Sequence, residues 1–262
     1  MNCIFICLFN NPNYINMLFL LLESIQLYGE LKDTEILIYT STQFMKVIKL
    51  CPYPIINELT KFEINDNYKT VEKACKSRLD LFDLLVHTNK KYNYEKILYL
   101  DTDIIVKGNL QNIFDLCHED KLYVLEEGSI NSDTDFWGKT LFQNAGDLEL
   151  HTKKMDAKAF SSGILLFNNC EKIKDLFTAI QKDMIARPFK FYCHDQPYIV
   201  YNAFKYGLYD NQTLKPFVVN NDYDIKSNKI IHHFPGDPGM HQNKLKHMVA
   251  FIINLKQMHF KI

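Results

Sequence analysis

The chain has 262 residues and a formal net charge of −1, from 30 Lys and Arg residues against 31 Asp and Glu residues. Hydrophobic residues make up 47% and charged residues 23%, which is typical of a globular protein and excludes a disordered or fibrous one. The balanced charge gives no sign of the broad basic surface that binds nucleic acids or anionic membranes. Because a chain of this length can bury one large core, we expect a single domain over residues 1–262.

The first elements predict an α/β fold. Residues 4–9 form a short apolar run, which indicates a buried strand that ends at the polar residues 10–13. Apolar residues then recur at helical spacing over residues 14–28, and Gly29 is a natural stop for that helix. A second strand is expected at residues 35–40. The order strand, helix, strand favours an α/β sheet.

The later elements continue this alternation. Residues 71–87 have the pattern of one long amphipathic helix. Further strands are expected at residues 96–100, 104–106, 122–125, 164–167 and 229–232, and further helices at 171–186, 196–205 and 243–258. Residues 127–158 are polar and weakly periodic, so we expect a mobile loop or lid there.

The cysteines and the N-terminus indicate a cytoplasmic location. The seven cysteines are odd in number and include no C-x-x-C pair, which predicts reduced thiols rather than a disulfide framework. The apolar residues 3–9 and 17–22 are separated by residues 10–13, and no basic residue precedes the first run. We therefore expect neither a signal peptide nor an integral membrane segment.

The strongest functional signal is Asp101-Thr102-Asp103, directly after the apolar residues 97–100. Two carboxylates at the end of a buried strand can converge on one hard cation, and oxygen ligands suit magnesium or manganese. In open α/β sheets the ligand crevice lies at the carboxyl ends of the strands, where this pair is expected. The alternative is a solvated turn with two surface aspartates, because short D-x-D patterns are common.

A phosphatase can use the same residues. Haloacid-dehalogenase-type phosphatases also carry D-x-D after an apolar strand, with the first Asp as the nucleophile. They place this motif near the start of the domain and follow it with Thr or Val two residues on. Here a long segment precedes Asp101, and Ile105 takes the later position. The phosphatase is therefore the less favoured hypothesis.

Small residues lie before the expected strand at residues 164–167. Ser161, Ser162 and Gly163 would let the backbone approach a ligand closely, although an ordinary turn into a strand has the same composition. Asp195 and Gln196 open the expected helix at residues 196–205. A helix cap alone would explain Asp195, and the functional alternative is a carboxylate with a neighbouring amide on the acceptor side of a site.

Three kinds of basic residue complete the candidates. His232 ends the expected strand at residues 229–232 and His233 follows it, where a neutral imidazole can supply a third metal ligand, although a single histidine is usually structural. Lys244 lies beyond a turn rich in Pro and Gly and can meet a diphosphate as a point charge. Arg78 either belongs to a surface charge pattern or points inward and neutralises a phosphate.

The order of these motifs resembles glycosyltransferase family 8, the group that includes glycogenin and the bacterial lipooligosaccharide galactosyltransferases. The resemblance extends from residue 4 to about residue 248 and rests on RLDLFDLL, YLDTDIIV, FSSGILLFN, HDQPYI and HHFPG. It implies the GT-A nucleotide-sugar-binding fold, an α/β fold with a mixed central sheet flanked by helices.

The resemblance also implies which residues bind the donor. The ligands of Mn²⁺ or Mg²⁺ would be Asp101, Asp103 and His233, although the residues alone leave His232 open. The uracil and ribose would lie on Leu8, Asn10, Asn11 and Tyr14. The remaining donor-binding residues would be Arg78, Thr102, Ser161, Ser162, Gly236 and Lys244. The catalytic group would comprise Asp195, Gln196, Arg78 and Lys244.

Two positions depart from the family pattern. Gly239 stands where the family has the lysine that follows H-F-x-G, so we assign the phosphate contact to Lys244 instead. Replacement of Lys244 by Ala should lower catalytic efficiency by roughly ten- to a hundredfold if the lysine binds the phosphate. Thermal stability should stay almost unchanged, because an isolated surface lysine changes stability by no more than about 0.5 kcal/mol. Ser161 stands where Asn is usual, which would alter the contacts to the donor sugar.

The activity implied by the resemblance is a retaining transfer of a hexose, glucose or galactose first of all, from a UDP-sugar. The acceptor could be a glycan, a protein, a lipid or a small molecule. The metal and Arg78 or Lys244 would stabilise the departing diphosphate. The alternatives are a metal-dependent phosphatase or nucleotidyltransferase, and a sugar-nucleotide-binding relative without transfer activity.

Overall fold

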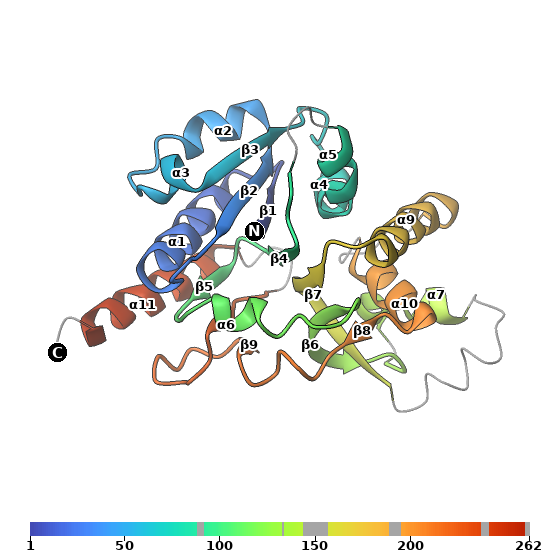
Figure 1. Cartoon of the computed structure of the whole chain (residues 1–262). Helices are drawn as coiled ribbons and strands as arrows, with labels where there is room; N and C mark the ends of the chain where they lie inside the picture. Colours follow the sequence, from blue (N-terminus) through green and yellow to red (C-terminus); the bar gives the residue numbers. More distant parts are fainter. Residues whose placement is uncertain (88–91, 133, 144–156, 189–194, 237–240, 260–262) are drawn as a thin grey trace.

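The computed structural model describes residues 1–87, 92–132, 134–143, 157–188, 195–236 and 241–259. A mixed sheet of seven strands has the order β3-β2-β1-β4-β7-β6-β8, and a smaller sheet of three strands has the order β5-β10-β9. Helices lie on both sides of the large sheet (Figure 1). The expected α/β fold with a mixed central sheet flanked by helices is confirmed.

The large sheet changes strand direction at β4. β3, β2, β1 and β4 are parallel neighbours, whereas β7 is antiparallel to β4 and to β6, and β8 is parallel to β6. In sheet order the strands are β3 (Thr60–Ile64), β2 (Thr34–Thr40), β1 (Asn2–Leu8), β4 (Lys96–Leu100), β7 (Lys158–Asn168), β6 (Leu122–Ser129) and β8 (Tyr209–Asp210).

The small sheet joins segments that are far apart in the chain. Its strands are β5 (Ile104–Val106), β10 (Ile231–His233) and β9 (Val218–Asn220). β10 lies in the middle, antiparallel to β5 and parallel to β9. Because β5 follows β4 after three residues, the small sheet begins at the carboxyl edge of the parallel strands.

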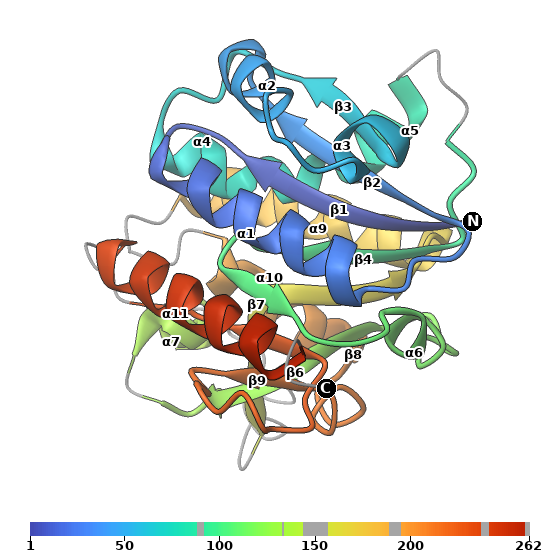
Figure 2. The ribbon, with the colours of Figure 1, turned by 90° about the vertical axis from the view of Figure 1, so that its left-hand side faces the viewer.

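The helices surround both sheets. The α-helices are α1 (Asn13–Tyr28), α2 (Thr42–Ile48), α3 (Ile55–Glu58), α4 (Val71–Lys76), α5 (Leu81–His87), α6 (Gln111–Phe114), α7 (Lys139–Gln143), α9 (Glu171–Ala186), α10 (Gln196–Tyr206) and α11 (His241–His259). Two short 3-10 helices are η1 (Ser77–Asp80) and η2 (Asp135–Trp137). Helix α1 lies beside β1, and α11 runs against α1 (Figure 2).

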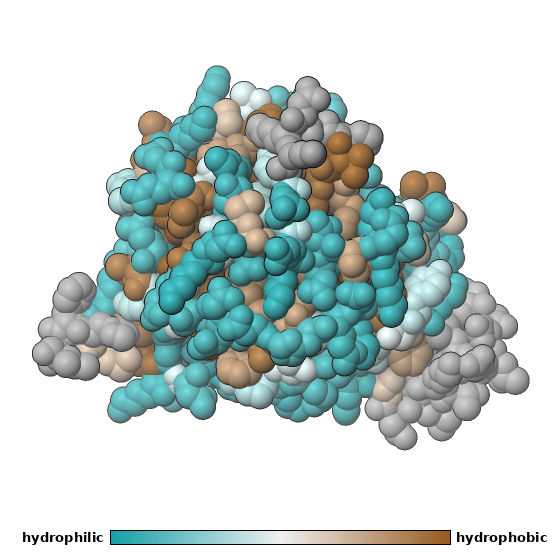
Figure 3. All heavy atoms as spheres, viewed as in Figure 1, coloured by the Kyte–Doolittle hydropathy of each residue, from teal (hydrophilic) through white to brown (hydrophobic). Residues whose placement is uncertain are grey.

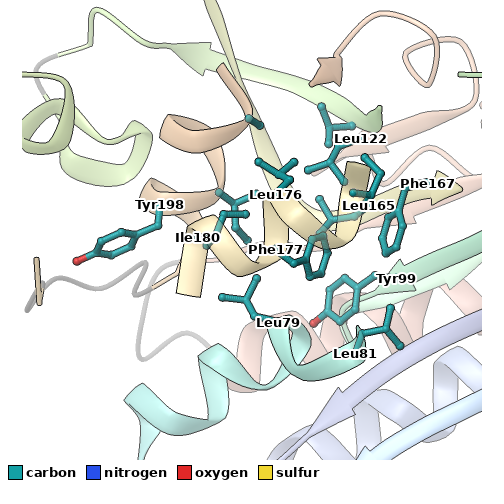
Figure 4. Packing of buried hydrophobic residues seen from close by; sticks show 14 of the residues in the cluster. Leu79, Leu81, Tyr99, Leu122, Leu165, Phe167, Leu176, Phe177, Ile180 and Tyr198 are labelled. Carbon is teal, nitrogen blue, oxygen red and sulfur yellow. The ribbon is translucent and has the colours of Figure 1, made fainter. Parts of the chain in front are cut away.

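The core lies on both faces of the large sheet. Cys3 and Phe5 of β1 belong to a cluster on one face, and Ile4 and Ile6 belong to a cluster on the other, as the two-residue alternation of a strand requires. This double burial explains why β1 is almost wholly apolar. Figure 4 shows the first cluster, in which side chains of η1, α9 and α10 pack on β4 and β7. Each buried Leu or Phe stabilises the fold by roughly 1.5–3 kcal/mol.

Most elements occur where the sequence predicts them. The strand at residues 96–100 and the helix at residues 171–186 have the expected bounds. The strands expected at residues 122–125 and 164–167 are extended into β6 and β7. As a result, the small residues Ser161, Ser162 and Gly163 lie inside β7 and not in a turn before it, because β7 pairs with β4 and β6 on both sides.

The prediction of one helix over residues 71–87 is wrong. The 3-10 helix η1 separates α4 from α5. Ser77 Oγ donates to the Ala74 carbonyl at 2.6 Å, and Arg78 Nη1 donates to the Ser162 carbonyl at 2.5 Å. The Ser77 bond is local and the Arg78 bond is a tertiary contact, and both accompany a tightened turn that helical periodicity does not encode.

The lid expected at residues 127–158 is partly regular. β6 continues to Ser129, η2 and α7 follow, and β7 begins at Lys158. Residues 133 and 144–156 of the expected lid lie outside the described residues.

The surface carries mainly polar side chains on the face seen in Figure 3, with smaller hydrophobic patches between them. Within the described part of the chain, none of the helices is long and apolar enough to cross a membrane. Six of the seven cysteines are free thiols, and Cys193 lies outside the described residues.

Candidate functional site

Two carboxylates and an imidazole converge where the two sheets meet. Asp101 follows β4, Asp103 precedes β5, and His233 ends β10. One ligand atom of each residue lies within 4.8 Å of those of the others, an arrangement that could hold a metal ion. Main-chain hydrogen bonds hold the backbone of both aspartates in place. The Asp101 N–H donates to the Gly163 carbonyl, and the Phe234 N–H donates to the main-chain carbonyl of Asp103, each at 2.9 Å.

The surroundings of this group fit a hard divalent cation. Two carboxylates and one imidazole form a ligand set that suits Mn²⁺ or Mg²⁺. Gly163 leaves the room that the group needs, because a Cβ atom at this position would lie 2.5 Å from His233 Cε1 and 3.0 Å from Asp101 Oδ2. His233 Nε2 faces Asp103 Oδ1 at 3.3 Å, so this ring nitrogen points into the ligand group.

The other histidine faces a different environment. His232 Nδ1 lies 3.0 Å from the Asp222 carbonyl, and the ring packs on Phe251 with centroids 4.6 Å apart. Burial lowers the pKa of His232, which keeps its imidazole neutral. Neighbouring residues of a strand point to opposite faces, so only His233 joins the two aspartates.

Lys244 reaches the same group from helix α11. Its Nζ lies 2.6 Å from Asp103 Oδ2, and both side chains are nearly buried. A Cβ atom at Gly236 would lie 2.8 Å from Lys244 Cε, so the bare glycine gives the lysine stem its path. Burial alone would raise the pKa of Asp103, but the charges of Lys244 and His233 outweigh it and lower that pKa.

Arg78 connects the Asp195 carboxylate to the group formed by Asp101, Asp103 and His233. Its Nε lies 2.8 Å from Asp195 Oδ2, its Nη1 lies 3.5 Å from Asp101 Oδ1, and its guanidinium stacks 4.6 Å from the Tyr99 ring centre. Asp195 makes no capping bond to helix α10, so the structure does not support the cap as its role. Burial raises the pKa of Asp195 to about 6, although the positive charge of Arg78 opposes that shift.

Gln196 ties these residues to strand β7. Its Oε1 accepts from the Ser162 N–H at 3.0 Å and from the Ser162 hydroxyl at 3.1 Å. Its Nε2 donates to the Phe136 carbonyl of η2 at 3.2 Å. The Ser162 carbonyl in turn accepts from Arg78, so one buried serine joins both residues.

The residues expected to bind the nucleotide differ in their burial and in their hydrogen bonds. Burial raises the pKa of Tyr14, and the negative charges of Asp103 and Asp101 add to that shift. With its amide turned over, Asn10 donates to the Lys69 carbonyl and accepts from the Val71 N–H, and Asn11 Oδ1 accepts from the Asn13 N–H at 3.0 Å. Leu8 is 2% exposed in the core, so its side chain is not free to contact a base. Thr102 is also buried.

Two residues near the site have no motif in the sequence. Asn220 Oδ1 lies 2.9 Å from His233 Nδ1, and Asn220 Nδ2 donates to Glu127 Oε2 at 2.8 Å. They lie 93 positions apart in the chain, and only the pairing of β9 with β10 brings Asn220 beside His233. A short sequence motif therefore cannot identify either residue.

Comparisons with known proteins agree with this arrangement. The family model for glycosyl transferase family 8 matches residues 11–210. No curated protein matches the chain by sequence.

Solved structures share the fold at low sequence identity. The galactosyltransferase LgtC, in complex with donor and acceptor sugar analogs, is 14% identical with a TM-score of 0.62, and the match covers 95% of each chain. Mouse xyloside xylosyltransferase 1 is 12% identical with a TM-score of 0.60, over 90% of this chain and 99% of that one. The glycosyltransferase GlyE of Streptococcus pneumoniae is 12% identical with a TM-score of 0.57, over 99% of this chain and 63% of that one. These similarities confirm the GT-A fold.

Proposed function

Because this chain belongs to glycosyltransferase family 8 and is a glycosyltransferase, we propose that it is a retaining hexosyltransferase with a UDP-sugar donor. Asp101, Asp103 and His233 would hold a divalent cation, Mn²⁺ or Mg²⁺, that the donor diphosphate contacts. We further propose that residues 1–262 form one GT-A domain.

The observation that carries this proposal is the convergence of Asp101, Asp103 and His233. They come from two distant places in the chain, the Asp101-Thr102-Asp103 segment and strand β10, yet one ligand atom of each lies within 4.8 Å of the others. Two aspartates on a solvated turn would not need a histidine from the neighbouring sheet. When bound, such a cation supplies Lewis-acid stabilisation of a diphosphate leaving group.

Two basic side chains are placed to bind the diphosphate. Lys244 already contacts Asp103, and Arg78 lies within 3.5 Å of Asp101. Both are nearly buried, where a charge-assisted bond to a phosphate oxygen is strong. We assign to them the stabilisation of the negative charge that develops on the departing diphosphate.

Asp195 and Gln196 are our candidates for the sugar side of the site. The Asp195 carboxylate pairs with Arg78, and the Gln196 amide is held by Ser162 and Phe136. A preorganised carboxylate and amide can orient sugar hydroxyls without moving during the reaction. Tyr14, Asn11 and the backbone after β1 would bind the nucleoside.

Family membership favours a transferase over the phosphatase or nucleotidyltransferase alternatives. The retaining stereochemistry and the UDP-sugar donor are proposed from the family. Glucose and galactose are our first choices of donor sugar. The acceptor class stays open among glycans, proteins, lipids and small molecules.

A donor panel tests the proposal. The purified protein is incubated with Mn²⁺ and with UDP-glucose, UDP-galactose and other UDP-sugars, each with and without simple sugar acceptors, and released UDP is measured. We expect release from a hexose donor that stops after chelation and in Asp103→Asn. The matched control is Asp175→Asn, which removes an exposed carboxylate from α9 and should leave turnover intact.

Other results would redirect the assignment. UDP binding without turnover of any donor would indicate an inactive relative. Cleavage of a simple phosphate monoester, with no UDP-sugar consumed, would support the phosphatase.

A further inference from the structure

The small sheet lines up polar residues from distant parts of the chain. In the register of β10, His233 lies opposite Ile104 of β5 on one side and opposite Asn220 of β9 on the other. Asp103 immediately precedes Ile104, and the Asn221 N–H donates to the His233 carbonyl at 2.9 Å. Asp103, His233 and Asn220 therefore form a row of polar residues across the small sheet, and the pairing of β5, β10 and β9 determines that row.

Glu127 of β6 extends this row into the large sheet. Asn220 Nδ2 donates to Glu127 Oε2 at 2.8 Å, and Asn220 Oδ1 lies 2.9 Å from His233 Nδ1. An ionised carboxylate can only accept hydrogen bonds, so it requires the NH₂ group of Asn220 to face it. The amide oxygen must then face His233, and this oxygen can only accept as well.

These directions determine where His233 carries its proton. The ring nitrogen that faces an obligate acceptor must be the donor, so Nδ1 keeps its hydrogen. Nε2 faces Asp103 Oδ1 at 3.3 Å, which is an acceptor as well, so a bound cation would take the place of a hydrogen on Nε2 and would meet its lone pair. An Asn220 amide turned the other way would offer NH₂ to Nδ1 and would leave the hydrogen on Nε2.

The environment of Glu127 suits this role. The side chain is half-buried, and burial raises its pKa, while hydrogen bonds from Ser161 and Asn220 favour the ionised form. The neighbouring Glu126 has different partners, Gln212 and Lys215, and takes no part in the row.

We infer that Glu127 is a positioning residue which, through the Asn220 amide, keeps a hydrogen on Nδ1 of His233 and holds the ring so that Nε2 faces the proposed metal site. The inference rests on the proposed metal site but not on the identity of the donor sugar or the acceptor. A hydrogen-bonded second layer of this kind typically changes metal affinity by about ten- to a hundredfold when it is lost.

Binding of Mn²⁺ alone tests the inference without any turnover. The free ion is measured by electron paramagnetic resonance in titrations of wild type, Glu127→Ala, Glu127→Gln and the matched control Glu126→Ala. We expect Glu127→Ala to bind Mn²⁺ about ten- to a hundredfold more weakly. Glu127→Gln should recover most of the loss, because its amide oxygen can still accept from Asn220. Glu126→Ala should bind as wild type does.

The hydrogen on Nδ1 gives a second readout, independent of affinity. Long-range ¹H–¹⁵N spectra of the metal-free protein should show a hydrogen on Nδ1 of His233 in wild type and a reduced occupancy of that hydrogen in Glu127→Ala. If Glu127→Ala does not fold, Asn220→Ala is expected to give the same two changes. A wild type whose Nδ1 carries no hydrogen would overturn the inference without any variant.

The outcomes separate this inference from the proposed function. If wild type binds no Mn²⁺, with or without UDP, the metal site itself is wrong. If wild type binds and Glu127→Ala binds equally well, only the role of Glu127 is wrong. A Glu127→Ala protein with normal Mn²⁺ affinity and a raised KM for the donor would assign Glu127 to the substrate instead.

Discussion

Lys244 is held by Asp103 in a nearly buried ion pair, with 2.6 Å between Nζ and Oδ2. The expectation from sequence, that its loss leaves thermal stability unchanged, assumed an isolated surface lysine. A buried carboxylate that loses its partner is costly, so that expectation is revised. The ammonium also occupies a carboxylate oxygen that a metal ion would use.

Replacement of Lys244 by Ala should therefore have two effects. Catalytic efficiency should fall about ten- to a hundredfold, because a charged hydrogen bond to the diphosphate contributes roughly 1.5–3 kcal/mol. The melting temperature of the metal-free protein should fall, and Mn²⁺ should restore it by neutralising Asp103. Steady-state kinetics and thermal melts with and without Mn²⁺ measure both.

The control for this variant lies on the same helix. Lys246 is exposed on α11, so Lys246→Ala should change neither quantity. Wild-type kinetics in Lys244→Ala would place the phosphate contact on Arg78 alone.

Gly163 should not tolerate a side chain. The methyl of Gly163→Ala would lie 2.5 Å from His233 Cε1 and 3.0 Å from Asp101 Oδ2, so the ligand group must open. We expect Mn²⁺ binding and transfer to be lost, with a stability cost of about 1–3 kcal/mol for overpacking. Mn²⁺ titration and chemical denaturation measure the two effects.

Gly108→Ala is the matched control. Its nearest neighbour would be Ile230 Cγ1 at 3.5 Å, an ordinary contact. Mn²⁺ affinity in Gly163→Ala equal to that of Gly108→Ala would show that the ligand group lies elsewhere.

The site could be predicted from sequence only where its residues belong to short motifs. Asp101 and Asp103 follow a plainly apolar strand, which marks them as a pair at a sheet edge. Adjacent histidines could not be told apart, because the choice depends on the face of β10 that each occupies. Glu127 and Asn220 could not be found at all, since their contact depends on strand pairing between distant segments.

At the scale of elements, the pair of Arg78 and Asp195 connects the η1 turn to the start of helix α10. Neither atom of the 2.8 Å contact, Arg78 Nε or Asp195 Oδ2, has a well-aligned hydrogen bond among the described residues. A donor oxygen that enters between the two elements could supply that bond. Among the described residues, the charged groups that shift the pKa of Asp195 are Arg78 and Asp101.

This pair predicts an acidic limb in the pH profile. The pKa of Asp195 is raised to about 6, so the carboxyl is ionised above that pH and takes up a proton below it. We expect kcat/KM to fall as pH drops through about 6, since a neutral Asp195 no longer pairs with Arg78. The pH dependence of kcat/KM measures this limb.

The same proton has the opposite sign for stability. A carboxyl whose pKa is higher in the folded protein binds its proton more tightly when folded, so its own contribution to stability rises as pH falls from about 6 toward 4. The loss of activity should therefore precede any unfolding. In Asp195→Asn the residual activity should lack this limb. A limb that survives there would belong to another group, with His233 the first to examine.

Elements with strong periodicity could be predicted, and elements set by tertiary contacts could not. β4 and α9 have clear apolar patterns and match their expected bounds. The η1 break in residues 71–87 coincides with the tertiary contact of Arg78 with Ser162, which helical periodicity does not encode. The edge strand β3 is short and mixed in polarity, so only its pairing with β2 defines it.

At the scale of the whole molecule, the change of strand direction at β4 creates the site. β4 is parallel to β1 but antiparallel to β7, and the chain leaves β4 directly into the small sheet. The carboxylates, the histidine and Lys244 therefore meet at one junction between two sheets and α11. The fold class followed from the order of strands and helices, whereas the pairing of β5, β10 and β9 needed the three-dimensional structure.

The most direct measurement is the calorimetric affinity for UDP with Mn²⁺ and after thorough chelation, in wild type and in Asp103→Asn. We predict that Mn²⁺ strengthens UDP binding by wild type at least about tenfold, which corresponds to 1.4 kcal/mol. Asp103→Asn should fold normally and show almost no such gain, because an amide is a weaker ligand for a hard cation. Equal affinity for UDP with and without Mn²⁺ in wild type would contradict a metal ion held between Asp101, Asp103, His233 and the diphosphate.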